Sequence, residues 1–149
     1  MSILNSEDIY LFNEGRYHKA YRKMGAHFHI ENGQKGAWFS VWGPQAQAIS
    51  VVGDFNQWKS GVHNLTTYGN SGLWSGFIPG VTEGQIYKFR ITAMNGDVIE
   101  KADPFSFWCE EPPRTGSRLF QSRHQWNDET WMNSRTRNQA AKKAISIYE

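Results

Sequence analysis

Short apolar runs with a period of two residues fill the middle of the chain, and each ends at Gly, Asn, Asp or Pro. Such alternation is typical of strands with one buried face, and the closing residues are typical of tight turns. No regular alternation of strands with helices accompanies these runs, which disfavours a parallel sheet. The sequence therefore predicts a β-sandwich, with strands over 37–42, 48–53, 73–78, 86–93 and 98–101 and another near 118–121.

The two ends of the chain have a different pattern from its middle. Residues 6–13 predict a short helix with Ser6 as its N-cap and acidic residues in its first turn. After Pro112-Pro113 the sequence is irregular and basic, with a short helix expected after Asn127 or Asp128. Residues 139–144 favour helix, and 145–149 predict a strand. We expect an N-terminal helical extension over 1–21, a sandwich over 22–122, and a linker helix with a truncated strand over 123–149.

Composition narrows the range of partners. Sixteen basic and fourteen acidic residues leave a formal charge of +2, too small a field to hold the whole molecule on nucleic acid or an anionic membrane. The single Cys109 rules out an internal disulfide framework, and the first residues contain no apolar stretch of signal-peptide length. We expect a cytoplasmic protein with a neutral partner. Aromatic residues reach 15%, which indicates that some rings face a ligand or another domain.

Residues 53–58, Gly-Asp-Phe-Asn-Gln-Trp, are similar to the GDFNxW turn of family 48 carbohydrate-binding modules, and other family motifs stand in the expected order at 39–46, 71–74, 79–80, 87–89 and 101–104. The resemblance implies an all-β, immunoglobulin-like sandwich of the early-set type with short helical N- and C-terminal extensions. It also implies an α-glucan partner, glycogen or a maltooligosaccharide.

The flanking sequences narrow the resemblance. Residues 11–15, 24–27 and 145–149 resemble bacterial 1,4-α-glucan branching enzymes. The resemblance implies that 145–149 begins a family 13 glycoside hydrolase barrel, which would hold the catalytic carboxylates and act as a partner of this domain. Such enzymes form α-1,6 branches in glycogen biosynthesis. The chain departs from the family pattern at Trp38, Gly43 and Ala144, and it has Val98 and Ile99 where glycogen-binding relatives often have a second stacking Trp.

Trp58 is the leading candidate for contact with sugar, because a glucose ring has a face of C–H groups and an edge of hydroxyls. Asn56 and Lys88 are candidate hydrogen-bonding partners, since strand alternation places Lys88 opposite the aromatic residues on either side of it. Trp74 is a candidate flanking ring. Covering roughly 60 Å² of one indole gives on the order of 1.5 kcal/mol, so we expect roughly millimolar affinity.

Each candidate also has a structural interpretation. Trp58 could cover the edge of the sandwich or dock on the barrel. Lys88 could be a solvated charge, and Trp74 could be packed in the core. The module then positions the barrel without binding glucan. Nucleic-acid binding through the basic arm at 114–143 is a third, weaker hypothesis.

The sequence predicts no catalytic residue, metal site or cofactor. His27 and His29 share one side of an extended segment but lack a third metal ligand nearby. Three acidic residues could suggest the carboxylate pair of a glycosidase; they are Asp97, Glu100 and Asp103. Their position in a turn-rich hairpin is the better explanation.

Overall fold

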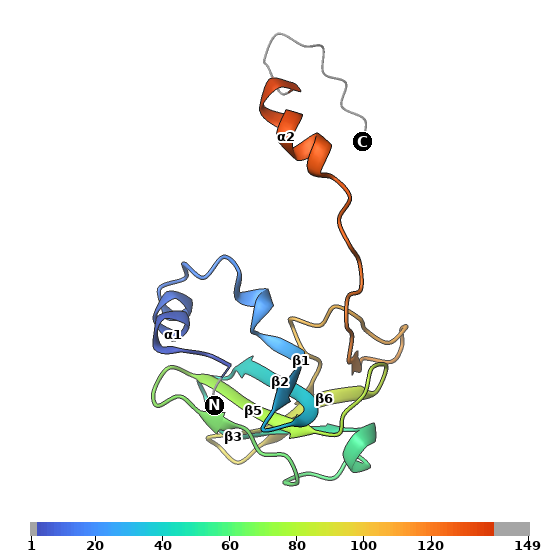
Figure 1. Cartoon of the computed structure of the whole chain (residues 1–149). Helices are drawn as coiled ribbons and strands as arrows, with labels where there is room; N and C mark the ends of the chain where they lie inside the picture. The colour runs from blue at the N-terminus through green and yellow to red at the C-terminus, as the bar shows by residue number, and fades with distance from the viewer. Residues whose placement is uncertain (1–2, 139–149) are drawn as a thin grey trace.

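Two antiparallel sheets face each other in a sandwich, shown by the computed structural model in Figure 1, which describes residues 3–138. The first sheet has the order β1-β2-β5-β4, and the second has β6 paired with β3 on one edge and with β7 and β8 on the other. The strands are β1 (Gly25–Glu31), β2 (Gln34–Trp42), β3 (Ala46–Gly53), β4 (Thr66–Thr67), β5 (Leu73–Pro79), β6 (Ile86–Ala93), β7 (Val98–Lys101) and β8 (Ser117–Arg118). The helices are α1 (Ser6–Asn13), α2 (Glu129–Asn138) and the short 3-10 helices η1 (Ala20–Arg22) and η2 (Asp54–Asn56). The predicted all-β fold class is confirmed.

Aromatic side chains from both sheets meet in the core. The Phe39 ring from β2 contacts Tyr87 from β6 edge to face, with ring centroids 5.1 Å apart. Phe89 is also fully buried and packs edge to face on Tyr87. Because burial alternates along β6, the residues between these aromatics face outward.

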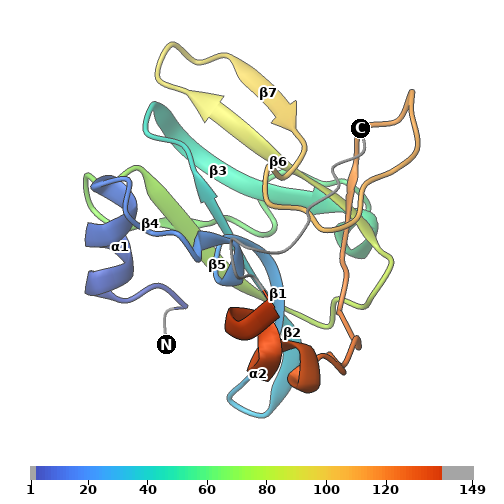
Figure 2. The ribbon, with the colours of Figure 1, turned by 90° about the horizontal axis from the view of Figure 1, so that it is seen from above.

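A second apolar cluster joins α1 to the outer side of the first sheet. Leu4, Met24 and Leu73 are buried together there, and Figure 2 shows α1 beside β4 and β5. The predicted helix over 6–13 is confirmed, but its N-cap is Asn5 and not Ser6, because the Asn5 side chain accepts a hydrogen bond from the Asp8 backbone N–H. The predicted domain boundaries, between residues 21 and 22 and between residues 122 and 123, remain predictions.

Beyond β8 the chain leaves the sandwich in an extended segment and forms α2, which Figure 1 shows well separated from both sheets. The helix begins just after Asp128, as predicted. The helix expected over 139–144 and the strand over 145–149 lie outside the described residues. Among residues 3–138, no helix combines the length and apolar composition needed to cross a bilayer.

Candidate functional site

The loop after β3 is held in shape by the side chain of Asn56. Its Oδ1 accepts from the Gly53 backbone N–H at 2.9 Å, and its Nδ2 donates to the Val51 carbonyl at 2.8 Å and lies 3.0 Å from His63 Nδ1. Burial lowers the pKa of His63, which favours the neutral ring beside this amide. Only 8% of Asn56 is exposed, so the structure assigns this residue to the loop and not to a sugar-facing surface.

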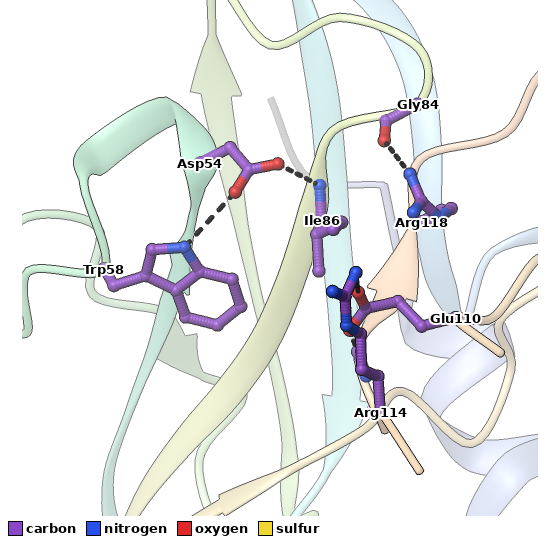
Figure 3. Close-up of polar contacts among 8 residues, drawn as sticks. Asp54, Trp58, Gly84, Ile86, Glu110, Arg114 and Arg118 are labelled. Carbon is purple, nitrogen blue, oxygen red and sulfur yellow. Dashed lines mark hydrogen bonds and ion pairs between the residues drawn. The ribbon is translucent and has the colours of Figure 1, made fainter. Parts of the chain in front are cut away.

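Trp58 projects from this loop with 40% of its surface exposed. Its Nε1–H donates to Asp54 Oδ1 at 3.2 Å, and Asp54 Oδ2 accepts from the Ile86 backbone N–H at 2.8 Å (Figure 3). One carboxylate therefore ties the indole to the start of β6, and Figure 3 shows the ring beside the Ile86 side chain. Because the indole N–H already donates to Asp54, the part of Trp58 left for a ligand is the face of its ring.

Lys88 lies on the same outer face as Ile86, two residues further along β6. Its neighbours Tyr87 and Phe89 are buried, as strand alternation predicted, and its Nζ donates to Thr115 Oγ1 at 2.8 Å. The structure thus gathers a flat ring, an aliphatic side chain and an ammonium group on one surface. A sugar needs apolar area for its C–H face and donors for its hydroxyls, and this surface has both.

Trp74 lies apart from this surface. It is 8% exposed, belongs to the core, and donates from Nε1 to the Gly43 carbonyl at 3.0 Å. It borders a cavity of about 450 Å³ with Ala46 and Met94. Ala46 begins β3, whereas Trp58 follows the end of that strand, and a strand of this length spans about 25 Å. The structure therefore does not bring Trp74 and Trp58 together.

Several residues beside Trp58 were not predicted as part of the site. Glu110 Oε2 accepts from the Gly116 backbone N–H at 3.0 Å, and Arg114 Nη1 lies 3.9 Å from Glu110 Oε1. Figure 3 shows these side chains across Ile86 from the indole of Trp58. Glu110 and Arg114 are far from Trp58 in the sequence, so no local sequence pattern placed them near it.

Three of the other polar groups singled out in the sequence, His27, Glu100 and Asp103, have structural partners. His27 Nε2 contacts the Met24 carbonyl at 2.8 Å, and within the described part of the chain no group of three or more His, Cys, Asp or Glu side chains is arranged to hold a metal ion. Glu100 forms an ion pair with Arg90 at 2.8 Å. Asp103 is buried and accepts from the Tyr87 hydroxyl at 2.5 Å.

Comparison with known proteins agrees with this architecture. Residues 23–106 match carbohydrate-binding module 48, the isoamylase N-terminal domain. The chain is 43% identical over 143 residues to a 1,4-alpha-glucan branching enzyme GlgB of Synechococcus sp. (95% of this chain, 19% of the relative). It is 44% identical over 149 residues to that of Aromatoleum aromaticum (99% of this chain, 23% of the relative). The chain thus spans about a fifth to a quarter of the length of these curated relatives.

Solved structures share the fold. A Klebsiella pneumoniae pullulanase complexed with maltotriose superposes with a TM-score of 0.52 at 23% identity, over 66% of this chain and 9% of that chain. A Salmonella typhimurium protein described as a putative alpha amylase gives a TM-score of 0.52 at 20% identity, over 72% of this chain and 16% of that chain. Because the family model covers more than half of the sequence and the sandwich agrees with it, the chain belongs to the carbohydrate-binding module 48 family.

Proposed function

We propose that the surface around Trp58 binds α-glucan, such as glycogen or a maltooligosaccharide. The observation that carries the proposal is the exposed indole of Trp58, fixed by Asp54 beside the outward-facing Lys88. Family membership and the names of the 1,4-alpha-glucan branching enzymes give further support.

The expected affinity of this surface is low. Stacking one sugar on one indole contributes on the order of 1.5 kcal/mol by its apolar area, and the cost of association offsets part of any gain. Attachment to a glucan-processing domain raises the effective affinity, because the second binding event becomes intramolecular. We propose that the chain is the N-terminal accessory region of a cytoplasmic branching enzyme, in which a separate domain forms α-1,6 branches.

Electrophoresis in native gels containing glycogen tests the proposal. The chain should be retarded relative to a glycogen-free gel, and Trp58→Ala should abolish the retardation. Trp126→Ala is the matched control, because Trp126 is 78% exposed but lies beyond β8 in the segment leading to α2. Equal mobility of the unaltered chain with and without glycogen would refute glucan binding.

A second candidate function is docking on a catalytic domain of the same polypeptide. Exposed aromatic side chains border a cavity of about 340 Å³ beside β1; they are Tyr21, Phe107 and Phe120. Water-exposed rings gathered in this way are typical of a surface that another domain covers.

Mixing the chain with a separately produced catalytic barrel of a relative tests docking. We expect a complex in analytical ultracentrifugation that Phe107→Ala weakens and that Val62→Ala, a change at another exposed apolar residue, leaves intact. Absence of a complex at high micromolar concentration would argue against this function.

A further inference from the structure

The segment 108–110 extends the second sheet beyond β8. The Arg118 backbone N–H donates to the Trp108 carbonyl at 2.7 Å, and the Glu110 N–H donates to the Gly116 carbonyl at 2.9 Å. On its other side β8 pairs with β6, where Arg118 stands opposite Ile86. Residues directly opposite each other in an antiparallel pair point to the same face, so Arg118 lies on the outer face that carries Ile86.

Trp108 is a second exposed indole on this part of the molecule. It is 44% exposed, its ring centroid lies 5.2 Å from the guanidinium carbon of Arg118, and Phe120 packs against it edge to face at 6.4 Å. Cation–π and aromatic contacts of this kind fix a ring without burying it. The indole is therefore held in place and still accessible.

Polar groups suited to sugar hydroxyls surround this ring. Trp108 borders a cavity of about 480 Å³ that is also lined by acidic and basic residues, Glu110, Glu111, Arg114 and Arg118. Carboxylates accept hydrogen bonds and guanidinium groups donate them. Because a sugar hydroxyl can both donate and accept, it can bond to either kind of group here. An apolar plane edged by such groups is the chemistry that a pyranose ring requires.

Ile86 connects this cavity with the surface around Trp58. The side chains of Ile86 and Glu110 both lie over Gly116. A Cβ placed on this glycine would be 2.5 Å from Ile86 Cγ2 and 2.5 Å from Glu110 Oε2. Figure 3 shows Ile86 between the indole of Trp58 and the Glu110–Arg114 pair. Ile86 and the 108–110 segment are separated by two strand spacings, about 10 Å. Trp58 lies on the opposite side of Ile86. The surface from Trp58 to the 108–110 segment is therefore wider than one sugar ring.

We propose that Trp108, with Arg118 and Glu110 beside it, forms a second sugar subsite, so that one α-1,4-linked glucan chain extends from Trp58 across Ile86 to Trp108. This inference rests on the proposed glucan binding at Trp58. The second stacking ring then comes from the segment before β8 and not from the β6–β7 hairpin, where Val98 and Ile99 are exposed aliphatic residues.

Titrations with maltotriose and maltoheptaose, followed by the indole N–H signals in NMR spectra, test the subsite. Maltoheptaose should shift the signals of both Trp58 and Trp108. Trp108→Ala should weaken maltoheptaose binding about tenfold, the effect of uncovering one indole face, and should change maltotriose binding much less. Trp58→Ala should abolish binding of both sugars, and Trp126→Ala should change neither.

The outcomes separate the two proposals. If Trp58→Ala abolishes binding while Trp108→Ala binds maltoheptaose normally, the subsite is wrong and glucan binding at Trp58 stands. If the unaltered chain binds neither sugar, both proposals fail. If circular dichroism shows that Trp108→Ala does not fold, Trp108→Phe replaces it in the test. Because Phe keeps a flat ring, this variant should retain part of the preference for maltoheptaose over maltotriose. Complete loss of that preference, with binding at Trp58 intact, would overturn stacking at this position.

Discussion

Asn56 illustrates how a residue in a sugar-binding motif can stabilise the conformation of a loop without contacting the ligand. Its amide satisfies backbone groups of Gly53 and Val51 inside the loop that presents Trp58. Gln57 and Trp58 both have positive φ, at 54° and 60°, a backbone conformation that is costly for residues other than Gly. The hydrogen bonds of Asn56 help to offset that cost.

Replacing Asn56 should destabilise the fold before it affects any ligand contact. Asn56→Ala leaves buried backbone groups without partners, and we expect a loss of about 2 kcal/mol in the free energy of unfolding. Urea denaturation measures this loss, with Asn70→Ala at an exposed turn position as the control. Unchanged stability together with lost glycogen retardation would instead show that Asn56 contacts sugar.

Asp103 gives the fold a pH dependence of its own. Burial raises the pKa of Asp103 above its ordinary value, although the Tyr87 hydroxyl and the Phe105 N–H donate to it. A carboxyl whose pKa is raised by folding destabilises the native state as pH increases from about 4 through the folded-state pKa. Asp103→Asn removes this titration.

Thermal unfolding across a pH series checks the sign. The melting temperature of the unaltered chain minus that of Asp103→Asn should decrease as pH rises above about 4 and then level off. A difference that grows with pH would show that hydrogen bonds to the carboxylate outweigh its burial.

At the scale of elements, α1 depends on a reciprocal cap. Asn5 and Asp8 each accept from the other's backbone N–H at 2.8 Å, and Lys23 Nζ lies 2.5 Å from Asp8 Oδ2. Burial acts to raise the pKa of Asp8, but the hydrogen bonds from Asn5 and Lys23 outweigh it, so the pKa is lowered. This helix end is therefore most stable when Asp8 is ionised.

Asp8→Asn should cost about 1 kcal/mol of stability at neutral pH. The cost should shrink as pH falls below about 4, because the group with a lowered pKa then loses its charge in the unaltered chain as well. Urea unfolding at pH 7 and pH 3 measures both values, and Glu7→Gln, an exposed change in the same helical turn, should have little effect at either pH. An equal cost at both values would exclude a contribution from the charge.

Strand prediction gave the correct bounds at the β6–β7 hairpin and missed β1 and β4. The strands over 86–93 and 98–101 have the predicted bounds, because burial alternates at the start of β6 and the Asn95-Gly96 turn marks where the hairpin reverses. β1 was treated only as an extended segment, although Ala26 and Phe28 do alternate inward. β4 consists of two residues and is too short for a periodic signal.

The candidate site was predictable only where its residues are close in sequence. The motif at 53–58 identified Trp58, and alternation gave the direction of Lys88. Trp74 was predicted as a ring that flanks the site, but the structure places it near Ala46, at the opposite end of β3 from Trp58. The contribution of Glu110 and Arg118 depends on sheet pairing between segments far apart in sequence, which local patterns do not encode.

At the scale of the whole molecule, the sandwich should be stable without α2. An ion pair between Arg123 and Glu83, 2.6 Å long, ties the extended segment back to the loop before β6. Ending the chain after Arg123 removes a helix that Figure 1 shows apart from both sheets. We expect the melting temperature to change by less than about 2 °C, since elements that bury little apolar surface contribute little to global stability.

Scanning calorimetry measures this change. A truncation that ends instead after Ser117 removes the buried Leu119 as well and should lower the melting temperature strongly. Similar losses for both truncations would show that α2 contributes to the folded core.

Cys109 stands alone among the 149 residues as a thiol, is exposed, and sits between Trp108 and Glu110 on the rim of the cavity. A nitroxide attached there needs no prior removal of other cysteines. Paramagnetic broadening of the signals of a bound oligosaccharide would then show which end of the glucan lies nearest Trp108.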